Sequence, residues 1–317
     1  MSRWPGGMTV VSLLGLTTHS FPVIIAGMQN EQTPKKRAGF AVMIGRSNVG
    51  KSTLMNTIVG SKVAITTPKP QTTRLPIQGI LTREEGQIVF VDTPGLFKLA
   101  KDELTKKLLK SVKESLRDVD VILYVVDPTR SIGDEEKAVM ALIRDIDTPK
   151  IFVINKSDLK RKPYLDYYRD LAEEFDESVE VSALHSKHTG RLVEMIFDRL
   201  PEGEAFYPPG QLTNLPNKEW LAELIREKLF LRLRQEVPYT VHVEVNEVEQ
   251  RANGMLYIKG TIFTTDDRYK RMIIGKGGRG IKEIGQSTRN ELETVLQQQV
   301  YLDLTVEVDP HWVTRFE

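Results

Sequence analysis

Hydrophobic residues between positions 38 and 200 recur in two alternating patterns. Short apolar runs occupy Gly39–Ile44, Gln87–Val91, Val121–Val126, Lys150–Ile154 and Ser178–Val181. Segments with helical spacing lie mostly between these runs and comprise Lys51–Val59, Asp102–Leu116, Asp134–Arg144, Pro163–Phe175 and Thr189–Leu200. Near-continuous apolar strands that alternate with helices are typical of a mostly parallel sheet covered on both faces. The pattern predicts an α/β domain over residues 38–200, with its ligand at the carboxyl ends of the strands.

The pattern changes after residue 200. Residues 201–217 are rich in Pro and Gly and lack periodicity, which predicts a linker. Further helices and strands are expected at Lys218–Gln235, Tyr239–Val248, Met255–Thr264, Gly280–Gln298 and Tyr301–Val308. Asn253-Gly254 stands between the two strands of this group as a favoured hairpin turn. Residues 218–317 are therefore predicted to form a second, smaller α+β domain.

Residues 1–37 are predicted to be a disordered N-terminal extension. Trp4–Asn30 contains no Asp, Glu, Lys or Arg, but Gly6-Gly7 and Pro22 interrupt it. It is therefore a poor candidate for a membrane span or a signal peptide, which need longer apolar runs. Met28 is an alternative start to Met1 and Met8, because an ordinary polar lead follows it. Peripheral binding of this stretch to the inner face of the cell membrane remains an open alternative.

Composition and charge narrow the classes of function. The 317 residues carry 44 Lys+Arg and 43 Asp+Glu, a net charge of +1, so any nucleic-acid site must be local. The chain contains no cysteine, which excludes disulfides, thiolate zinc sites and cysteine nucleophiles. It also suits a reducing compartment.

The segment Gly45–Ser52 follows a predicted strand and opens a helix. Its sequence, Gly-Arg-Ser-Asn-Val-Gly-Lys-Ser, fits the phosphate-binding loop of nucleotide hydrolases. Backbone N–H groups and the helix N-terminus attract phosphate oxygens, Lys51 meets the β- and γ-phosphates, and the Ser52 hydroxyl ligates Mg²⁺. The expected contact residues are Gly45, Asn48, Val49, Gly50, Lys51, Ser52 and Thr53.

Three later segments, each directly after a predicted strand, specify the nucleotide. Asp92-Thr-Pro-Gly95 provides a carboxylate for the metal and an N–H, from Gly95, for the γ-phosphate. In Asn155-Lys156-Ser157-Asp158, the Asp158 carboxylate accepts two hydrogen bonds from guanine, Asn155 braces the loop, and the Lys156 stem lies on the base. In Ser182-Ala183-Leu184, the Ala183 N–H donates to guanine O6. Each segment alone could be a plain turn, but their order together with the phosphate loop predicts a GTP site.

A local basic cluster marks the second predicted domain. Residues 268–282 contain six Lys or Arg and no acid. The turn Gly275-Lys276-Gly277-Gly278 lies within it and matches the G-x-x-G loop that clamps single-stranded nucleic acid in KH domains. Ile273, Ile274, Ile281 and Ile284 are expected to floor the groove for the bases. A purely structural turn is the alternative. The predicted RNA contacts are Ile274, Gly275, Lys276, Gly277, Gly278, Arg279 and Ile281.

Together these motifs resemble the translation-factor-related GTPases, and within that class the Era family of ribosome-assembly GTPases. Pro70-Gln-Thr-Thr-Arg74 and the KH-like segment add to the resemblance, which covers about residues 39–312. Ser47 departs from the family, which more often has Pro there. The resemblance implies a mostly parallel GTPase domain followed by a KH domain.

The resemblance also implies a mechanism. Thr66–Pro76 would be a first switch in which Thr73, or Thr72 beside it, ligates Mg²⁺, so that Lys51 and Thr73 are the catalytic residues. Asp92 to about Lys101 would be a second switch. Leu96 cannot orient water, which predicts slow turnover. Asn48 either braces the loop or holds a monovalent cation.

The implied partners are the 3′ region of 16S rRNA and the small ribosomal subunit, bound by a cytoplasmic monomer that acts in subunit assembly and 16S rRNA maturation. Two other functions stay open. One is an RNA scaffold whose hydrolysis is incidental, and the other is a GTPase acting on membranes or cell-cycle partners through the N-terminal stretch.

Overall fold

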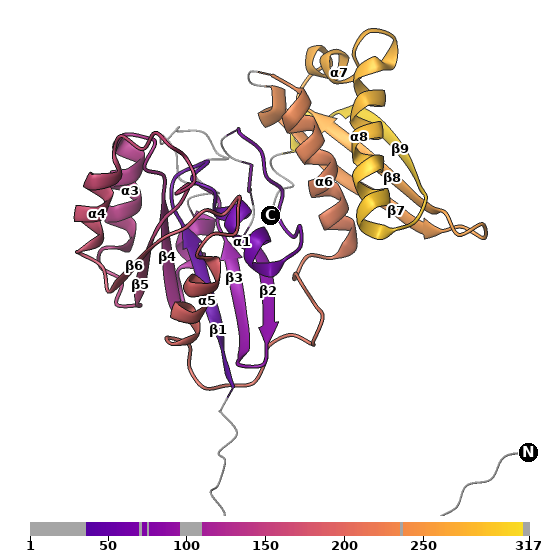
Figure 1. Ribbon diagram of the computed structural model, residues 1–317. Coiled ribbons are helices and arrows are strands. Elements are labelled where there is room, and N and C mark those ends of the chain that lie inside the picture. Colours follow the sequence, from indigo (N-terminus) through magenta and orange to yellow (C-terminus); the bar gives the residue numbers. More distant parts are fainter. Residues whose placement is uncertain (1–35, 70–71, 75, 96–109, 235–236, 313–317) are drawn as a thin grey trace, which may run out of the picture. The chain divides into compact units, whose positions relative to one another are not determined.

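The computed structural model describes residues 36–69, 72–74, 76–95, 110–234 and 237–312 (Figure 1). Residues 1–35 of the predicted N-terminal extension, Leu96, most of the second switch and the first part of the helix expected at Asp102–Leu116 lie outside these ranges. The predicted extension is one residue too long, because Arg37 already belongs to the first strand. Of that helix, residues 110–115 are described and are helical.

The first domain is built on a six-stranded sheet with the order β2-β3-β1-β4-β5-β6. Its strands are β1 (Arg37–Ile44), β2 (Ile77–Arg83), β3 (Gly86–Asp92), β4 (Val121–Val126), β5 (Lys150–Ile154) and β6 (Glu177–Glu180). Neighbouring strands pair in parallel except β2, which pairs antiparallel with β3. The mostly parallel sheet is confirmed. β2 was not among the predicted apolar runs, because its last residues are exposed.

Helices cover both faces of this sheet, as Figure 1 shows. They are α1 (Lys51–Val59), α3 (Asp134–Ile143), α4 (Leu165–Ala172) and α5 (Thr189–Phe197). Leu54 of α1 and Leu192 of α5 share one core with inward residues of the strands. Val139 of α3 and Leu171 of α4 share the opposite core. Burial on two faces explains why the inner strands β1, β4 and β5 are apolar at nearly every position.

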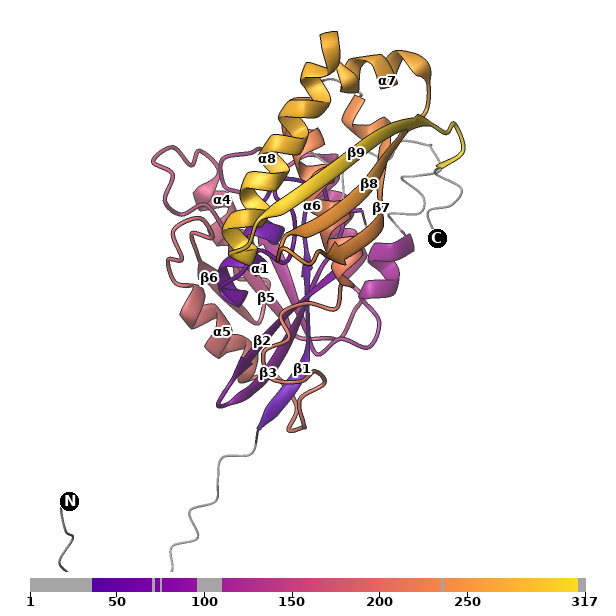
Figure 2. The ribbon, with the colours of Figure 1, turned by 90° about the vertical axis from the view of Figure 1, so that its right-hand side faces the viewer.

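The second domain packs helices on one face of a three-stranded sheet, β7-β8-β9. Its elements are α6 (Asn217–Arg232), a 3₁₀ turn at Val237–Thr240, β7 (Val241–Gln250), β8 (Leu256–Thr264), α7 (Asp267–Ile274), α8 (Arg279–Leu296) and β9 (Val300–Val308). β8 pairs antiparallel with β7 and parallel with β9, and Figure 2 shows the three strands side by side. The predicted α+β order is confirmed.

Residues 201–217 were predicted to be a linker, but part of this segment pairs with the first domain. The Ile80 N–H donates to the Leu212 carbonyl at 2.9 Å, and the Gln78 N–H donates to Asn214 Oδ1 at 3.0 Å. The fully buried Gln87 side chain bonds both the N–H and the carbonyl of Tyr207, at 3.0 and 2.9 Å. The segment lacks periodicity because backbone and side-chain hydrogen bonds, not an apolar face, attach it to the sheet.

We predict that Gln87→Leu releases the segment around Tyr207. The leucine keeps the buried volume but leaves the Tyr207 N–H and carbonyl without this partner, which should lower the free energy of unfolding by roughly 1–3 kcal/mol. Chemical denaturation measures the loss, and chymotrypsin cleavage near Phe206 should accelerate. Gln211→Ala is the matched control, because the Gln211 amide bonds Thr213 within the segment itself. Equal stability and cleavage of Gln87→Leu and the wild type would show that the attachment is not needed.

Candidate functional site

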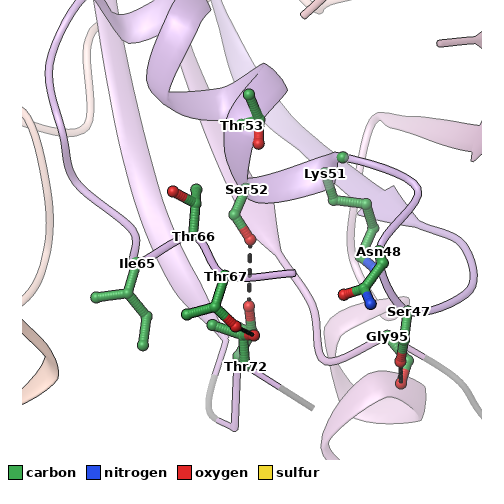
Figure 3. A pocket seen from close by; sticks show the side chains of 12 residues that line it. Ser47, Asn48, Lys51, Ser52, Thr53, Ile65, Thr66, Thr67, Thr72 and Gly95 are labelled. Carbon is green, nitrogen blue, oxygen red and sulfur yellow. Dashed lines mark hydrogen bonds between the residues drawn. The ribbon is translucent and has the colours of Figure 1, made fainter. Parts of the chain in front are cut away.

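The phosphate loop joins β1 to α1 at the carboxyl edge of the sheet. It contributes to a pocket lined by Ser47, Asn48, Gly50, Lys51, Ser52, Thr53, Ile65, Thr66, Thr67, Thr72, Thr73 and Gly95 (Figure 3). Gly50 has φ +100°, and a Cβ there would lie 2.3 Å from Asn155 Nδ2. Glycine is therefore required both by the backbone angle and by the approach of the Asn155 amide.

Lys51 is buried at the base of this loop. Its ammonium donates to the carbonyls of Gly45 and Arg46, at 3.2 Å each. Burial lowers the pKa of Lys51, while the Asp92 and Glu136 carboxylates oppose the shift. The cation is thus held inside the curve of the loop, where phosphate binding is expected.

Three oxygen-bearing side chains from distant segments meet beside Lys51. Ser52 Oγ donates to Asp92 Oδ2 at 2.5 Å, Thr73 Oγ1 donates to the same oxygen at 3.2 Å, and the two hydroxyls are 3.2 Å apart. The second Asp92 oxygen, Oδ1, is buried and lacks a hydrogen-bond partner among the described residues. Burial raises the pKa of Asp92, and Lys51 and the two hydroxyls oppose the rise.

This donor set fits a magnesium ion. Hydroxyl and carboxylate oxygens are the hard ligands that Mg²⁺ takes together with phosphates and water. A cation would also satisfy the unpartnered Asp92 oxygen. The three residues predicted to ligate the metal are therefore brought together, with Thr73 rather than Thr72 on the carboxylate. Thr72 bonds Thr67 instead, hydroxyl to hydroxyl at 2.6 Å.

Gly95 packs directly against the phosphate loop. A Cβ on Gly95 would lie 2.6 Å from the Ser47 Cα, so only glycine fits at this distance. The Ser47 hydroxyl donates to the Gly95 carbonyl at 3.2 Å. The start of the expected second switch therefore touches the loop that would hold the phosphates.

The loop of Thr73 is anchored on both sides. Asn48 Nδ2 donates to the Pro68 carbonyl at 2.7 Å, so that Asn48 braces this loop against the phosphate loop. On the other side, the buried Arg226 of α6 donates to the Thr72 carbonyl, and the buried Arg74 donates to the Val241 carbonyl at 2.7 Å. The position of Thr73 therefore depends on residues of both domains.

Asn155 connects the phosphate loop to the last predicted segment. Its amide donates to the Val49 carbonyl at 2.9 Å and accepts from the Ala183 N–H at 3.0 Å. Both bonds hold the two segments together, as the predicted bracing role requires. The Ala183 N–H, which was expected to serve guanine O6, is engaged by Asn155, so a base would have to share or replace this bond.

Asp158 lies at the open side of the same edge. Its carboxylate accepts from Ser182 Oγ at 2.5 Å, and this hydrogen bond is the main reason that its pKa is lowered. Asp158 is thus ionised at neutral pH, as an acceptor for guanine must be. Leu184 is 72% exposed beside it, so its side chain is available to cover a base.

Asp127, which was not among the predicted site residues, holds Lys156. Lys156 Nζ lies 2.7 Å from Asp127 Oδ2 and donates to the Asn48 carbonyl at 2.9 Å. Burial opposes ionisation of Asp127, but hydrogen bonds from Lys156 and Thr129 outweigh it and lower the pKa. The available signal was its position, since Asp127 is the first residue after β4 and thus lies at the same edge.

The glycine turn of the second domain joins α7 to α8. Gly275, Gly277 and Gly278 have φ of +71°, +61° and +75°, the left-handed region that favours glycine. Lys276 within the turn and Arg279 directly after it are exposed, and Ile274 and Ile281 are half-buried beside the turn. This arrangement leaves backbone and cations available to a phosphate chain.

One part of the predicted groove is wrong. Ile273 and Ile284 are 0% and 1% exposed and belong to the core that α7 and α8 form with the sheet. They are not available to a base, because helical spacing turns them inward.

Among the described residues, no helix combines the length and apolar character needed to cross a membrane.

Two family profiles match the chain. One is described as a 50S ribosome-binding GTPase and matches residues 40–156, and the other is a KH domain and matches residues 236–313. The first range runs from within β1 to just past the end of β5 and includes the phosphate loop. The second range covers the domain of the glycine turn without α6.

Similar proteins match most of the chain. GTPase Era of Halothermothrix orenii is 42% identical over 278 residues, which are 87% of this chain and 94% of that protein. GTPase Era of Heliobacterium modesticaldum is 41% identical over 284 residues, 89% of this chain and 95% of that protein.

Solved structures agree. A crystal structure of Era with MgGDPNP and nucleotides 1506–1542 of 16S ribosomal RNA matches with a TM-score of 0.82 and 38% identity, covering 88% of this chain and 96% of that one. An Aquifex aeolicus Era variant bound to GDP and aluminium fluoride matches with the same values. Both the residues of the nucleotide site and these relationships lead to one conclusion: the chain belongs to the Era family of GTPases.

Proposed function

We propose that this GTPase uses the site at the sheet edge as a switch that controls binding of single-stranded rRNA by the KH domain. The RNA would be the 3′ region of 16S rRNA, bound during assembly of the small ribosomal subunit and maturation of its rRNA. The protein would act as a cytoplasmic monomer.

The convergence of Ser52 and Thr73 on Asp92 is the observation that carries this proposal. Thr73 belongs to the loop of residues 66–76, whereas Ser52 and Asp92 lie at ends of regular elements. A Mg²⁺ held by all three, with the γ-phosphate, would order that loop, and hydrolysis would release it. Support for the RNA comes from the related Era crystallised with 16S rRNA nucleotides and from the exposed cations of the glycine turn.

Lys51 and Thr73 would have different catalytic roles. Lys51 would stabilise the charge that develops on the transferred phosphoryl group, and Thr73 would hold Mg²⁺ and sense the γ-phosphate. Asn48 would brace the loop, as its bond to Pro68 suggests, with a monovalent cation as the alternative. Turnover in potassium that exceeds turnover in sodium by more than tenfold would favour the cation.

The alternative functions differ in measurable ways. Turnover accelerated by rRNA favours the switch over a scaffold with incidental hydrolysis. Vesicle pelleting that requires residues 1–27 would favour a membrane partner, for which the described residues offer no spanning helix.

Lys51→Ala should abolish GTP hydrolysis and weaken binding of both nucleotides, because the phosphates lose their nearest cation. Thr73→Ala should spare GDP binding and weaken the GTP-bound state alone, because Thr73 serves the metal and the γ-phosphate. Turnover assays and calorimetric titration with GDP and GDPNP measure both effects. The assignment of Lys51 is lost if Lys51→Ala turns over GTP like the wild type.

Asp158→Asn should move the preference from guanine toward xanthine nucleotides, because the amide can donate to the 2-oxo group of xanthine. Loss of the matched carboxylate should weaken guanine nucleotide binding by about 1–3 kcal/mol, which is roughly 5- to 150-fold in affinity. Competition between GDP and xanthosine diphosphate measures the change. Wild-type protein that binds ATP as tightly as GTP would contradict this account of selectivity.

Lys276→Asp combined with Gly277→Asp should abolish RNA binding while GTP binding survives. The variant adds negative charge where phosphates must dock, and Asp tolerates the left-handed backbone of residue 277 better than most residues. Fluorescence anisotropy with a single strand from the 3′ end of 16S rRNA measures the loss. The wild-type salt slope should be about 0.7 per phosphate neutralised. If the double variant binds this strand normally, the turn is structural.

A further inference from the structure

A buried carboxylate outside the nucleotide motifs lies behind the phosphate loop. Glu136, in the first turn of α3, is 0% exposed. The hydroxyl of Tyr168 donates to its Oε2 at 2.9 Å, and the hydroxyl of Tyr124 donates to Oε1. Burial and the nearby carboxylate raise the pKa of both tyrosines, so they remain donors.

The cation that faces Glu136 is Arg46, the second residue of the phosphate loop. Arg46 Nε lies 2.7 Å from Glu136 Oε2, and the Arg46 side chain is almost fully buried. This contact is short, but its angle is not that of a good hydrogen bond, since Arg46 Nε lacks a hydrogen-bond partner among the described residues. The attraction is therefore mainly between charges.

Arg46 connects Glu136 to Lys51. Its guanidinium also donates to the Ser131 carbonyl at 2.8 Å, so the side chain is fixed at two points. Its backbone carbonyl accepts from Lys51 Nζ at 3.2 Å. Arg130 adds a parallel brace by donating to the Ser47 carbonyl at 2.8 Å. The segment between β4 and α3 thus holds residues 46 and 47 from outside.

Stability alone does not account for such a pair. Taking both charges out of water is costly, and uncharged side chains of similar volume often give equal or greater stability. Unlike neutral side chains, the ion pair fixes the direction of the Arg46 side chain and therefore the position of the phosphate loop that carries it.

We propose that Glu136 and Arg46 are positioning residues for GTP hydrolysis, which set the phosphate loop so that Lys51 faces the reacting phosphate. This inference goes beyond the nucleotide motifs and rests on the proposed role of Lys51. It predicts an effect mainly on kcat, because Lys51 contributes most when charge develops in the transition state.

The decisive variant combines Arg46→Met with Glu136→Gln. It leaves neither member of the pair as an unpaired buried charge. The glutamine oxygen still accepts from one tyrosine hydroxyl, and its NH2 group donates to the hydroxyl oxygen of the other tyrosine, so the packing is kept. The control combines Arg199→Met with Glu177→Gln, which removes an ion pair of 2.9 Å in the same domain that takes no part in the nucleotide site. Steady-state turnover, GDP affinity and thermal unfolding are measured for both, with Lys51→Ala as the inactive reference.

We expect the decisive variant to be folded at the assay temperature and to lose roughly 10- to 100-fold in kcat, the scale of a small misplacement in an active site, with a smaller change in KM. The control should keep wild-type kcat. A decisive variant with wild-type kcat overturns the inference, whereas wild-type turnover by Lys51→Ala would instead overturn the assignment of the site. If the decisive variant unfolds below the assay temperature, Tyr168→Phe carries the test. It loosens Glu136 without touching Arg46, and unchanged kcat there also overturns the inference.

Discussion

The buried Asp92 carboxylate is the interaction on which the nucleotide site depends. It lies at the end of β3 with no exposed surface, where an unpaired carboxylate would be costly. The hydroxyls of Ser52 and Thr73 offset that cost on one oxygen and leave the other oxygen for a cation. Because Ser52 lies in the first turn of α1 and Thr73 belongs to the loop before β2, this single carboxylate connects the rigid sheet to the element that would respond to the γ-phosphate.

Much of this site could be predicted because a parallel sheet collects its strand ends at one edge. Each of three motif segments lies at or directly after the end of an apolar strand: Gly45–Ser52, Asp92 and Asn155–Asp158. Their proximity therefore follows from the topology. The strand and helix positions were predictable for the same reason, since burial on both faces leaves long apolar runs. The edge strand β2 was not predicted because fewer of its side chains are buried and apolar.

The remaining features depend on contacts between residues far apart in sequence, which no local pattern encodes. Nothing near Glu136 indicates that it meets Arg46, 90 positions earlier, and Asp127 resembles any polar strand end until Lys156 reaches it. The hydrogen bonds of Gln87 to Tyr207 have no periodic signature. In the second domain the glycine turn was predictable from its motif, but the direction of each nearby isoleucine was not, since α7 and α8 bury one face each.

The central claim is that one Mg²⁺, bound through Asp92, makes the site distinguish GTP from GDP. The most direct measurement is the affinity for a non-hydrolysable GTP analogue with Mg²⁺ and with a chelator, in the wild type and in Asp92→Asn. We expect chelation to weaken wild-type binding of the analogue by roughly tenfold or more, about 1.4 kcal/mol. In Asp92→Asn, chelation should change the affinity for the analogue little, because the variant has already lost the metal ligand. The same dependence on Mg²⁺ in both proteins would contradict it.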